Sequence, residues 1–238
     1  MLDLAIVIHT CDKYAFLWEG WDYYFQKYWD FSLLCKVYFL NELLPVSFPQ
    51  IVHHPTGVGS WASRLRNGLL ELPETNVLYL QEDFWLKRQL PASWIISAFQ
   101  AFEDNRMDLL RWHTSESYRC ASSEIRVNNN CLLRYTSDSH FIVSHQSTIW
   151  RKAFLIDCLR GDETPWQNER EGTKRLKSLL RSDENSVKAF LLPIEPRNAW
   201  YPGRGVCHEG RLGSVGLRML WAMRVQRIFS NRPSNQLS

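Results

Sequence analysis

The feature that most constrains the fold is the alternation of short apolar runs with helical patterns in the N-terminal part of this 238-residue chain. Predominantly apolar runs occupy 4–8, 35–40 and 76–80, and helical patterns at 14–28 and 61–70 lie between them. Short apolar runs of this kind are typical of strands buried on both faces of a parallel sheet. The alternation therefore predicts an α/β fold with a mainly parallel central sheet and helices on its faces.

The rest of the chain continues this pattern less regularly. A helix is predicted at 92–104, a strand at 109–112, and an irregular loop or a hairpin insertion at 115–130. Next come a predicted helix that contains Ile149, Trp150, Phe154 and Leu155, a second helix at 173–180, and a strand at 189–192. Because no internal repeat or linker separates the two halves, we predict one domain over 1–211, followed by a C-terminal amphipathic helix and tail over 212–238.

Composition and charge argue against several classes of protein. The net charge of +3 comes from interspersed charges without a basic block, so a nucleic-acid partner is not expected. The six cysteines are scattered without a C-x-x-C pair, which favours reduced thiols in a cytoplasmic protein. The first strand begins too early for a signal peptide, and no apolar run reaches the length of a membrane span. We therefore expect a cytoplasmic protein that is neither secreted nor membrane-spanning.

The C-terminal tail carries apolar and basic residues at helical spacing. Leu217 and Trp221 share this segment with Arg218, Arg224 and Arg227. A basic amphipathic helix of this kind can lie on an anionic membrane surface, which would put the protein at the inner face of the membrane. Docking of the helix on its own domain is the alternative.

The strongest chemical signal is a pair of adjacent carboxylates directly after a predicted buried strand. The run 77–80 leads into Gln81, Glu82 and Asp83. Ligands of open α/β sheets bind outside the carboxyl ends of the strands, so this position puts acidic oxygens in a ligand crevice. Such oxygens suit Mg²⁺ or Mn²⁺ bridging a diphosphate, with one or two carboxylates from the protein. A solvated turn is the alternative.

The residues around this pair resemble the central segment of GT-A glycosyltransferases. In that family a Gly-containing loop, a helix reading roughly Ala-Arg-Asn-x-Gly-Leu and a strand precede a metal-binding Asp-x-Asp motif. Here the loop contains Gly59, with Ser60 as a candidate N-cap, the helix reads Arg-Leu-Arg-Asn-Gly-Leu over 64–69, and the acidic motif is Glu82-Asp83. Residues 6–12 look like the first strand and nucleotide-binding loop of that fold. Together, 59–65, 81–84 and 147–151 also look like bacterial glycosyltransferase-like proteins associated with surface polysaccharide synthesis.

The resemblance implies a single GT-A domain that binds a nucleotide-sugar donor and a divalent metal, Mn²⁺ or Mg²⁺. Thr10, Cys11 and Asp12 would then meet the nucleotide base or ribose, although Asp12 is equally suited to capping the following helix. Arg64 would reach the diphosphate or uracil side of the pocket, unless it is simply an exposed helical arginine.

The acidic motif departs from the family pattern, because Gln81 stands where an acid is usual. We therefore expect Gln81 and Glu82 among the donor contacts and Asp83 as the metal ligand. Many GT-A enzymes draw a further metal ligand or a diphosphate-binding arginine from a late loop, which makes His208 and Arg204 candidates. A lone loop histidine is more often only solvated, and that alternative stays open.

An inverting glycosyltransferase needs a general base for the acceptor hydroxyl, usually a carboxylate. The segment 163–172 supplies several carboxylates beside Trp166. The similar bacterial proteins carry Pro-Trp followed three residues later by Glu, which falls on Glu169, so Glu169 is the predicted base and Glu171 the second candidate. An acidic pair placed at a helix start by the macrodipole is the alternative. Trp85 and Trp166 are expected to stack on sugar rings.

These expectations converge on an enzyme that moves a sugar from a nucleotide-sugar donor to a glycan or lipid-linked acceptor, by inverting transfer, in bacterial polysaccharide synthesis. One alternative keeps the fold but attaches a nucleotide to a sugar phosphate. That chemistry usually needs a Gly-rich loop after the first strand, and 9–13 has no glycine. A second alternative is a catalytically silent carbohydrate-binding or scaffold protein of a polysaccharide-assembly complex, which the altered acidic motif and the 11 tryptophans support.

Overall fold

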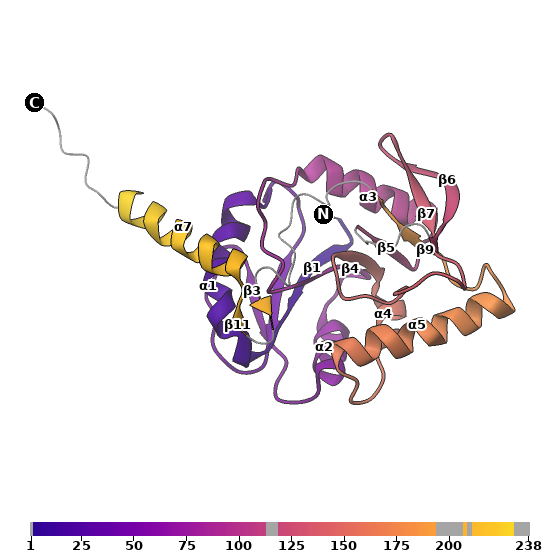
Figure 1. Cartoon of the computed structure of the whole chain (residues 1–238), viewed down its shortest axis with the longest axis horizontal. Helices are drawn as coiled ribbons and strands as arrows, with labels where there is room; N and C mark the ends of the chain where they lie inside the picture. Colours follow the sequence, from indigo (N-terminus) through magenta and orange to yellow (C-terminus); the bar gives the residue numbers. More distant parts are fainter. Residues whose placement is uncertain (1, 113–118, 194–206, 209–210, 231–238) are drawn as a thin grey trace, which may run out of the picture.

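The chain folds into three layers, with helices on both faces of one large sheet (Figure 1). The computed structural model describes residues 2–112, 119–193, 207–208 and 211–230. The sheet has nine strands in the order β3-β2-β1-β4-β8-β5-β9-β7-β6, and among the strands described in it only β8 and β7 run against the rest. This confirms the predicted α/β class with a mainly parallel central sheet.

The bounds of the elements follow the predicted alternation closely in the first half of the chain. The strands of the sheet are β1 (Leu4–His9), β2 (Val37–Asn41), β3 (Val52–Pro55), β4 (Asn76–Gln81), β5 (Leu109–Arg111), β6 (Ala121–Val127), β7 (Asn130–Arg134), β8 (Thr148–Arg151) and β9 (Ala189–Leu191). The helices are the 3₁₀ turn η1 (Asp12–Tyr14), α1 (Ala15–Tyr28), α2 (Trp61–Glu71), α3 (Ala92–Asp104), α4 (Lys152–Cys158), α5 (Pro165–Ser182) and α7 (Ser214–Ser230), and β10 (Cys207–His208) pairs with β11 (Arg211–Leu212).

The two faces of the sheet carry separate cores. Side chains alternate along a strand, so Ile6 and Ile8 of β1 pack toward α1 and α3, whereas Ala5 and Val7 pack toward α2, α4 and α5. Glycine at position 68 lets α2 approach β2, because a Cβ there would lie 2.5 Å from a methyl carbon of Leu40. The helix layers and the buried strands therefore form one compact unit.

The order of the strands places a crevice at one edge of the sheet. β1 lies between β2 and β4 and is parallel to both, with His9 opposite Leu40 on one side and opposite Gln81 on the other. The chain leaves β1 toward β2 and β3, then returns to β4 on the opposite side. In open α/β sheets this switch point is where the carboxyl ends of the strands leave room for a ligand.

Three predicted elements differ from the structure. Ile149 and Trp150 belong to strand β8 and pack on opposite faces of the sheet, and the helix begins only at Lys152. Periodicity cannot separate a strand from a helix over so short an apolar run. The segment between β2 and α2, for which no strand is predicted, contains the partly exposed strand β3. The hairpin alternative for 115–130 is confirmed by β6 and β7.

The third difference is the length of α5, which begins at Pro165 rather than near residue 173. Thr164 caps this helix: its hydroxyl accepts from the backbone N–H of Gln167, and the Gln167 side chain accepts from the backbone N–H of Thr164. This reciprocal capping box satisfies two N–H groups that a helix start leaves unpaired. Among the residues described, no helix is both long enough and apolar enough to cross a bilayer.

Candidate functional site

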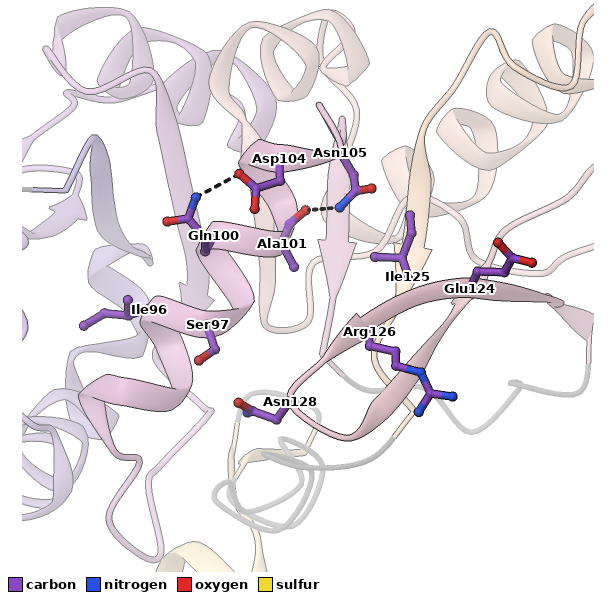
Figure 2. Close-up of a pocket in the computed structure, with 10 residues that line it drawn as sticks. All are labelled: Ile96, Ser97, Gln100, Ala101, Asp104, Asn105, Glu124, Ile125, Arg126 and Asn128. Carbon is purple, nitrogen blue, oxygen red and sulfur yellow. Dashed lines mark hydrogen bonds between the residues drawn. The ribbon is translucent and has the colours of Figure 1, made fainter.

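A cavity of about 570 Å³ opens at the switch point between β1 and β4. Its lining comes from the residues that follow these two strands, from the start of α2, from the start of α5 and from the loop before β8. A second cavity, of about 660 Å³, lies between α3 and the strand β6 (Figure 2). There the Gln100 amide donates to Asp104 at 2.8 Å and the Asn105 amide to the Ala101 carbonyl at 2.8 Å, so part of its polar lining is paired within α3 and the residue that follows it. The buried titratable groups gather in the first cavity, which is the candidate site.

The predicted acidic pair lies in this cavity. Gln81 ends β4, and Glu82 and Asp83 follow it into the lining, so a core strand presents both carboxylates at a crevice. Glu82 is buried, and the Oδ1 atom of Asp83 is buried without a hydrogen-bond partner. Burial, and then the neighbouring Asp83, raises the pKa of Glu82, and burial also raises the pKa of Asp83. The solvated-turn alternative is therefore wrong for these two residues.

A buried carboxylate, Glu82, next to a half-buried one, Asp83, whose buried Oδ1 has no partner, is a donor set suited to a cation. Within the described residues no three His, Cys, Asp or Glu side chains gather closely enough to hold a metal by themselves. Mg²⁺ and Mn²⁺ sites that act on phosphates need only one or two carboxylates, because water and the phosphates complete the coordination. The donor atoms of Glu82 and Asp83 thus fit a divalent cation that arrives together with a phosphorylated ligand.

Arg64 is buried and joins α2 to the β1 loop. Its Nη1 donates to the Thr10 carbonyl at 2.8 Å, and its Nε lies 3.6 Å from Oε1 of Glu42. It lines the cavity from the first turns of α2, where Ser60 caps the helix by accepting from the backbone N–H of Ser63. The exposed-arginine alternative is wrong, because Arg64 is only 4% exposed.

The three residues predicted after β1 do not all reach the cavity. Thr10 and Cys11 line it, but Asp12 does not. The Asp12 carboxylate accepts from the Asn41 amide at 2.8 Å and from the backbone N–H groups of Leu43 and Leu44, each at 2.9 Å. Burial acts to raise the pKa of Asp12, but the hydrogen bonds, led by that from Leu43, lower it below its usual value. Asp12 therefore binds the loop after β2, and the helix-cap alternative is wrong for it. Its contact with a ligand stays a prediction, which the place of Asp12 outside the cavity lining does not support.

Cys11 contributes a neutral thiol to the cavity. Burial, and then the charge of Glu82, raises the pKa of Cys11 to about 11. A thiol with so high a pKa stays protonated near neutral pH and is a poor nucleophile. Cys11 is therefore suited to contact a ligand rather than to attack it.

Glu169 lines the same cavity as the acidic pair but comes from helix α5. It lies in the second turn of α5, and its Oε1 accepts from the Ser144 hydroxyl and from the backbone N–H of His145, both at 2.8 Å. These two hydrogen bonds hold the carboxylate in place, and both are accepted by the same oxygen, Oε1. Glu169 is therefore the carboxylate of α5 that lines the cavity, and its role as a base stays a prediction.

Glu171, the second candidate base, lies elsewhere on α5. Residues two apart on a helix point in nearly opposite directions, so Glu171 cannot share the cavity with Glu169. It pairs with Lys174 at 3.0 Å and with Arg170 at 3.1 Å, and these partners lower its pKa. The geometry therefore places Glu171 on the outer surface of α5.

Two histidines that sequence reasoning did not assign form the deep part of the cavity. His9, the last residue of β1, is 1% exposed, and neither of its ring nitrogens has a hydrogen-bond partner. Burial, then Arg64 and His145, lowers the pKa of His9 well below its usual value. Burial also lowers the pKa of His145 to about 4, although the charge of Glu169 opposes that shift. Both imidazoles are therefore neutral near neutral pH.

The tautomer of His145 follows from its partner. The Asn168 amide nitrogen donates to the Cys158 carbonyl and to Glu163, so its oxygen is the atom that faces His145 Nε2 at 3.1 Å. His145 must donate through Nε2, which leaves Nδ1, buried without a partner, as a hydrogen-bond acceptor. The only sequence signal for this role is the position of the loop 144–146 just before a strand, and that strand was not predicted.

The aromatic predictions divide between core and cavity. Trp85 is fully buried in the core and donates to the Glu82 carbonyl at 2.9 Å, so it cannot stack on a sugar, and its predicted role is wrong. Trp166 is 70% exposed and lines the cavity mouth. Trp61 was not assigned a role, yet it lines the cavity with its ring centroid 4.3 Å from that of His145. Arg204 and the side chain of His208 lie outside the described part of the chain.

No protein-family model matches the sequence, and no curated protein matches it. Among solved structures, S. aureus TarS 1-349 is similar with a TM-score of 0.51 and 12% identity, over 84% of this chain and 60% of that chain. The same protein in complex with UDP is similar with a TM-score of 0.50 and 12% identity, over 82% and 61% of the two chains.

A looser likeness, to 2-C-methyl-D-erythritol 4-phosphate cytidylyltransferase from Thermus thermophilus, has a TM-score of 0.46 and 11% identity over 95% and 100% of the two chains, too low to support any inference. The present chain spans about 60% of the length of the TarS segment. The two TarS likenesses concern the fold alone, which is that of GT-A-like nucleotide-diphospho-sugar transferase domains.

Proposed function

We propose that this protein is a glycosyltransferase that moves a sugar from a nucleotide-sugar donor to a hydroxyl of a glycan or lipid-linked acceptor, with inversion at the sugar carbon. One observation carries the proposal. The lining of one cavity, at the switch point between β1 and β4, contains the buried Glu82, the half-buried Asp83 with its buried oxygen Oδ1, and Glu169 of α5, which accepts two hydrogen bonds. This pairing matches a site that stabilises a leaving diphosphate on one side and deprotonates an acceptor on the other.

The donor occupies the half of the cavity between β1 and β4 in this proposal. Asp83, with Glu82 beside it, would hold a divalent cation, which would supply positive charge next to the diphosphate. Arg64 adds a buried positive charge, and Lys13 lines the same cavity. Thr10 and Cys11 offer a hydroxyl and a neutral thiol to the nucleoside. Gln81 completes this side of the lining.

The acceptor enters beside α5. Glu169 takes the proton of the acceptor hydroxyl while that oxygen forms a bond to the anomeric carbon of the sugar. The bond from this carbon to the diphosphate oxygen breaks on the opposite face, and the nucleoside diphosphate leaves with the electron pair. Trp166, exposed at the cavity mouth, offers a flat apolar face to a sugar ring.

The wider assignment rests on the resemblance of the sequence to bacterial glycosyltransferase-like proteins of surface polysaccharide synthesis. We accordingly propose residues 1–211 as the catalytic unit and the cytoplasmic side of the membrane as its place of action. The late-loop candidates Arg204 and His208 remain part of the proposal as a further diphosphate contact and a further metal ligand.

A thermal-shift screen of nucleotide-sugars, with and without Mn²⁺ or Mg²⁺, tests the proposal. We expect one nucleotide to raise the melting temperature only when the cation is present, because a ligand that binds the native state stabilises it by mass action. Asp83→Asn should abolish the shift, and Glu171→Gln, the matched control outside the cavity, should keep it. No shift with any common nucleoside diphosphate would overturn the proposal.

The chemical products separate the three readings of the site. Release of a nucleoside diphosphate from the stabilising donor supports sugar transfer or its hydrolytic side reaction. Consumption of a nucleoside triphosphate with release of pyrophosphate would instead identify a nucleotidyltransferase. Binding without either product, unchanged by Asp83→Asn, would identify a silent binder.

A further inference from the structure

Over residues 214–224, whose side chains the structure describes, the C-terminal helix α7 is attached to the body through the face that carries Met219 and Met223. The Tyr24 hydroxyl of α1 donates to the backbone carbonyl of Met219 at 2.7 Å, and the side chains of Met219 and Met223 are buried. Leu220 packs partly against the same core. This docking bears out the alternative in which the helix is held by its own domain, and it leaves Leu217 and Trp221 exposed on another face.

The opposite face of α7 displays large apolar side chains. Trp221 is 70% exposed and Leu217 is 56% exposed, and Arg218 and Arg224 are exposed beside them. Positions 217, 221 and 224 follow the spacing of one helix face. The core does not require these apolar groups, because the methionines already anchor the helix. An exposed tryptophan and leucine between two arginines therefore indicate a contact surface.

The charge of this segment is opposite to that of the rest of the protein. After residue 210 the chain contains Arg211, Arg218, Arg224, Arg227 and Arg232 and no acidic residue. The net charge of the whole chain is only +3, so the part before this segment carries more acidic than basic residues. In Figure 1, α7 extends beyond α1, on the far side of the molecule from α5. A basic arm that extends from an acidic body fits a partner with a negatively charged surface.

The apolar side chains beside the arginines, Leu217 and Trp221, indicate which kind of anionic partner fits this face. A nucleic acid offers phosphates to arginine and base faces to tryptophan, but it offers little to an aliphatic side chain such as Leu217. A bilayer offers anionic headgroups to the arginines and an acyl boundary to both apolar side chains, and tryptophan favours that interface. The combination of Leu217 and Trp221 with the arginines therefore favours a lipid surface.

We propose that the exposed face of α7, defined by Leu217, Arg218, Trp221 and Arg224, docks the protein on membranes that contain anionic lipids. The helix lies in the plane of the headgroups, with the apolar pair at the acyl boundary and the arginines among the phosphates. This proposal does not depend on the proposed function, since it concerns a surface on another side of the molecule from α5. Together the two would bring the enzyme to a lipid-linked acceptor.

Cosedimentation of the full chain with vesicles tests this surface. We expect binding to phosphatidylcholine vesicles that contain phosphatidylglycerol, little binding to phosphatidylcholine alone, and release by salt. The double variant Arg218→Glu/Arg224→Glu should lower the partition coefficient by more than about tenfold, because each basic side chain near an anionic surface contributes severalfold. Trp221→Ala should lower it severalfold, while Arg218→Lys/Arg224→Lys, which keeps both charges, should retain most of it.

The matched control is Arg160→Glu/Arg181→Glu, which makes the same charge change at exposed positions on the α4 and α5 side. We expect it to bind mixed vesicles like the parent chain, and an equal loss in this variant would overturn the proposal. Equal binding to both vesicle types, or no binding to either by a chain that melts normally, would also overturn it. So would an α7-dependent dimer or an α7-dependent RNA complex in the absence of vesicle binding. Donor-induced thermal shifts, measured on the same preparations, keep this result separate from any failure of the proposed function.

Discussion

Asp12 and Asp83 follow neighbouring parallel strands at the same edge of the sheet, yet their surroundings are opposite. Asp12 accepts from the Asn41 amide and from three backbone N–H groups of the loop after β2, and its pKa is lowered. Asp83 keeps a buried oxygen without a partner, and its pKa is raised. The two carboxylates start from the same chemistry, and the hydrogen-bond donors around them make the difference.

This comparison shows how to separate structural from ligand-binding acids. A carboxylate whose oxygens are all engaged by the protein has no capacity left for a ligand and contributes to the stability of the loop. A buried carboxylate without donors costs stability until a cation or a ligand arrives. The two acids of α5 differ in a lesser way: Lys174 pairs with Glu171 on the surface, whereas Glu169 accepts both of its hydrogen bonds on Oε1 and lines the cavity.

The largest expected effect is that of Glu169→Gln. If Glu169 is the base, the amide keeps its hydrogen bonds in part but cannot accept a proton, so transfer should slow by about 10²- to 10⁴-fold. Donor binding, measured by thermal shift, should change little. Glu171→Gln is the control on the same helix and should leave the rate unchanged. A similar rate loss in both variants would contradict the distinction between the two acids.

The next effect is that of Asp83→Asn. Loss of the cation ligand should reduce turnover by on the order of a hundredfold or more, because the metal supplies several kcal/mol to the leaving group. The folded state should not lose stability, since an unpaired buried charge is removed. Initial rates measured against Mn²⁺ concentration check the loss of turnover, and melting curves check that stability is kept. A variant that melts much earlier than the parent would show that Asp83 has a structural role.

Asp12→Ala should lower the stability of the protein and leave its turnover nearly unchanged, which is the reverse of the effect expected for Asp83→Asn. The substitution leaves the amide of Asn41 and the N–H groups of Leu43 and Leu44 without their acceptor, and we expect a loss of about 1–2 kcal/mol in the free energy of unfolding. Turnover per folded molecule should be nearly that of the parent. Urea titration and a rate measurement well below the midpoint test this. A loss of rate without a loss of stability would indicate that Asp12 contacts the ligand and does not only hold the loop after β2.

The smallest effect concerns the pH dependence of stability. Burial, and then Asp83, raises the pKa of Glu82 from 4.5 to about 8, so between these values the folded state holds a proton that the unfolded state has released. Without a cation, stability attributable to Glu82 is therefore present at low pH and is lost as pH rises through that window. In Glu82→Gln the free energy of unfolding should fall less over this pH range than in the parent protein, by on the order of 1 kcal/mol.

The comparison of parent and variant isolates Glu82 from the histidines. His9 and His145 have lowered pKa values, so their contribution rises with pH at the acidic end of the range. Because both proteins contain these histidines, the difference between the two pH profiles belongs to the carboxylate pair. Saturating Mn²⁺ should restore the parent's stability near pH 8, since the cation binds the deprotonated form. Parallel profiles with and without Mn²⁺ would contradict a metal site at this pair.

Local chemistry was enough to predict much of the fold. The apolar runs at β1, β2 and β4 marked buried strands, and Ser60 marked the start of α2, because burial on two faces and helix capping each leave a pattern in a few adjacent residues. The acidic pair after β4 was predicted to lie in a crevice for the same reason, and it does. β8 was missed, since its run of apolar residues is too short to show a period.

The sequence by itself determined the parallel core, the placement of Glu82 and Asp83 at a strand end, and the acid-free basic tail. Only the tertiary structure decided that the Asp12 carboxylate is hydrogen-bonded by the loop after β2 and that Trp85 lies in the core. It also decided that His9, His145 and Trp61 line one cavity. The physical reason is that a polar group's role depends on which donors and acceptors reach it. Those partners come from segments distant in the chain, as when the amide of Asn168 sets the tautomer of His145.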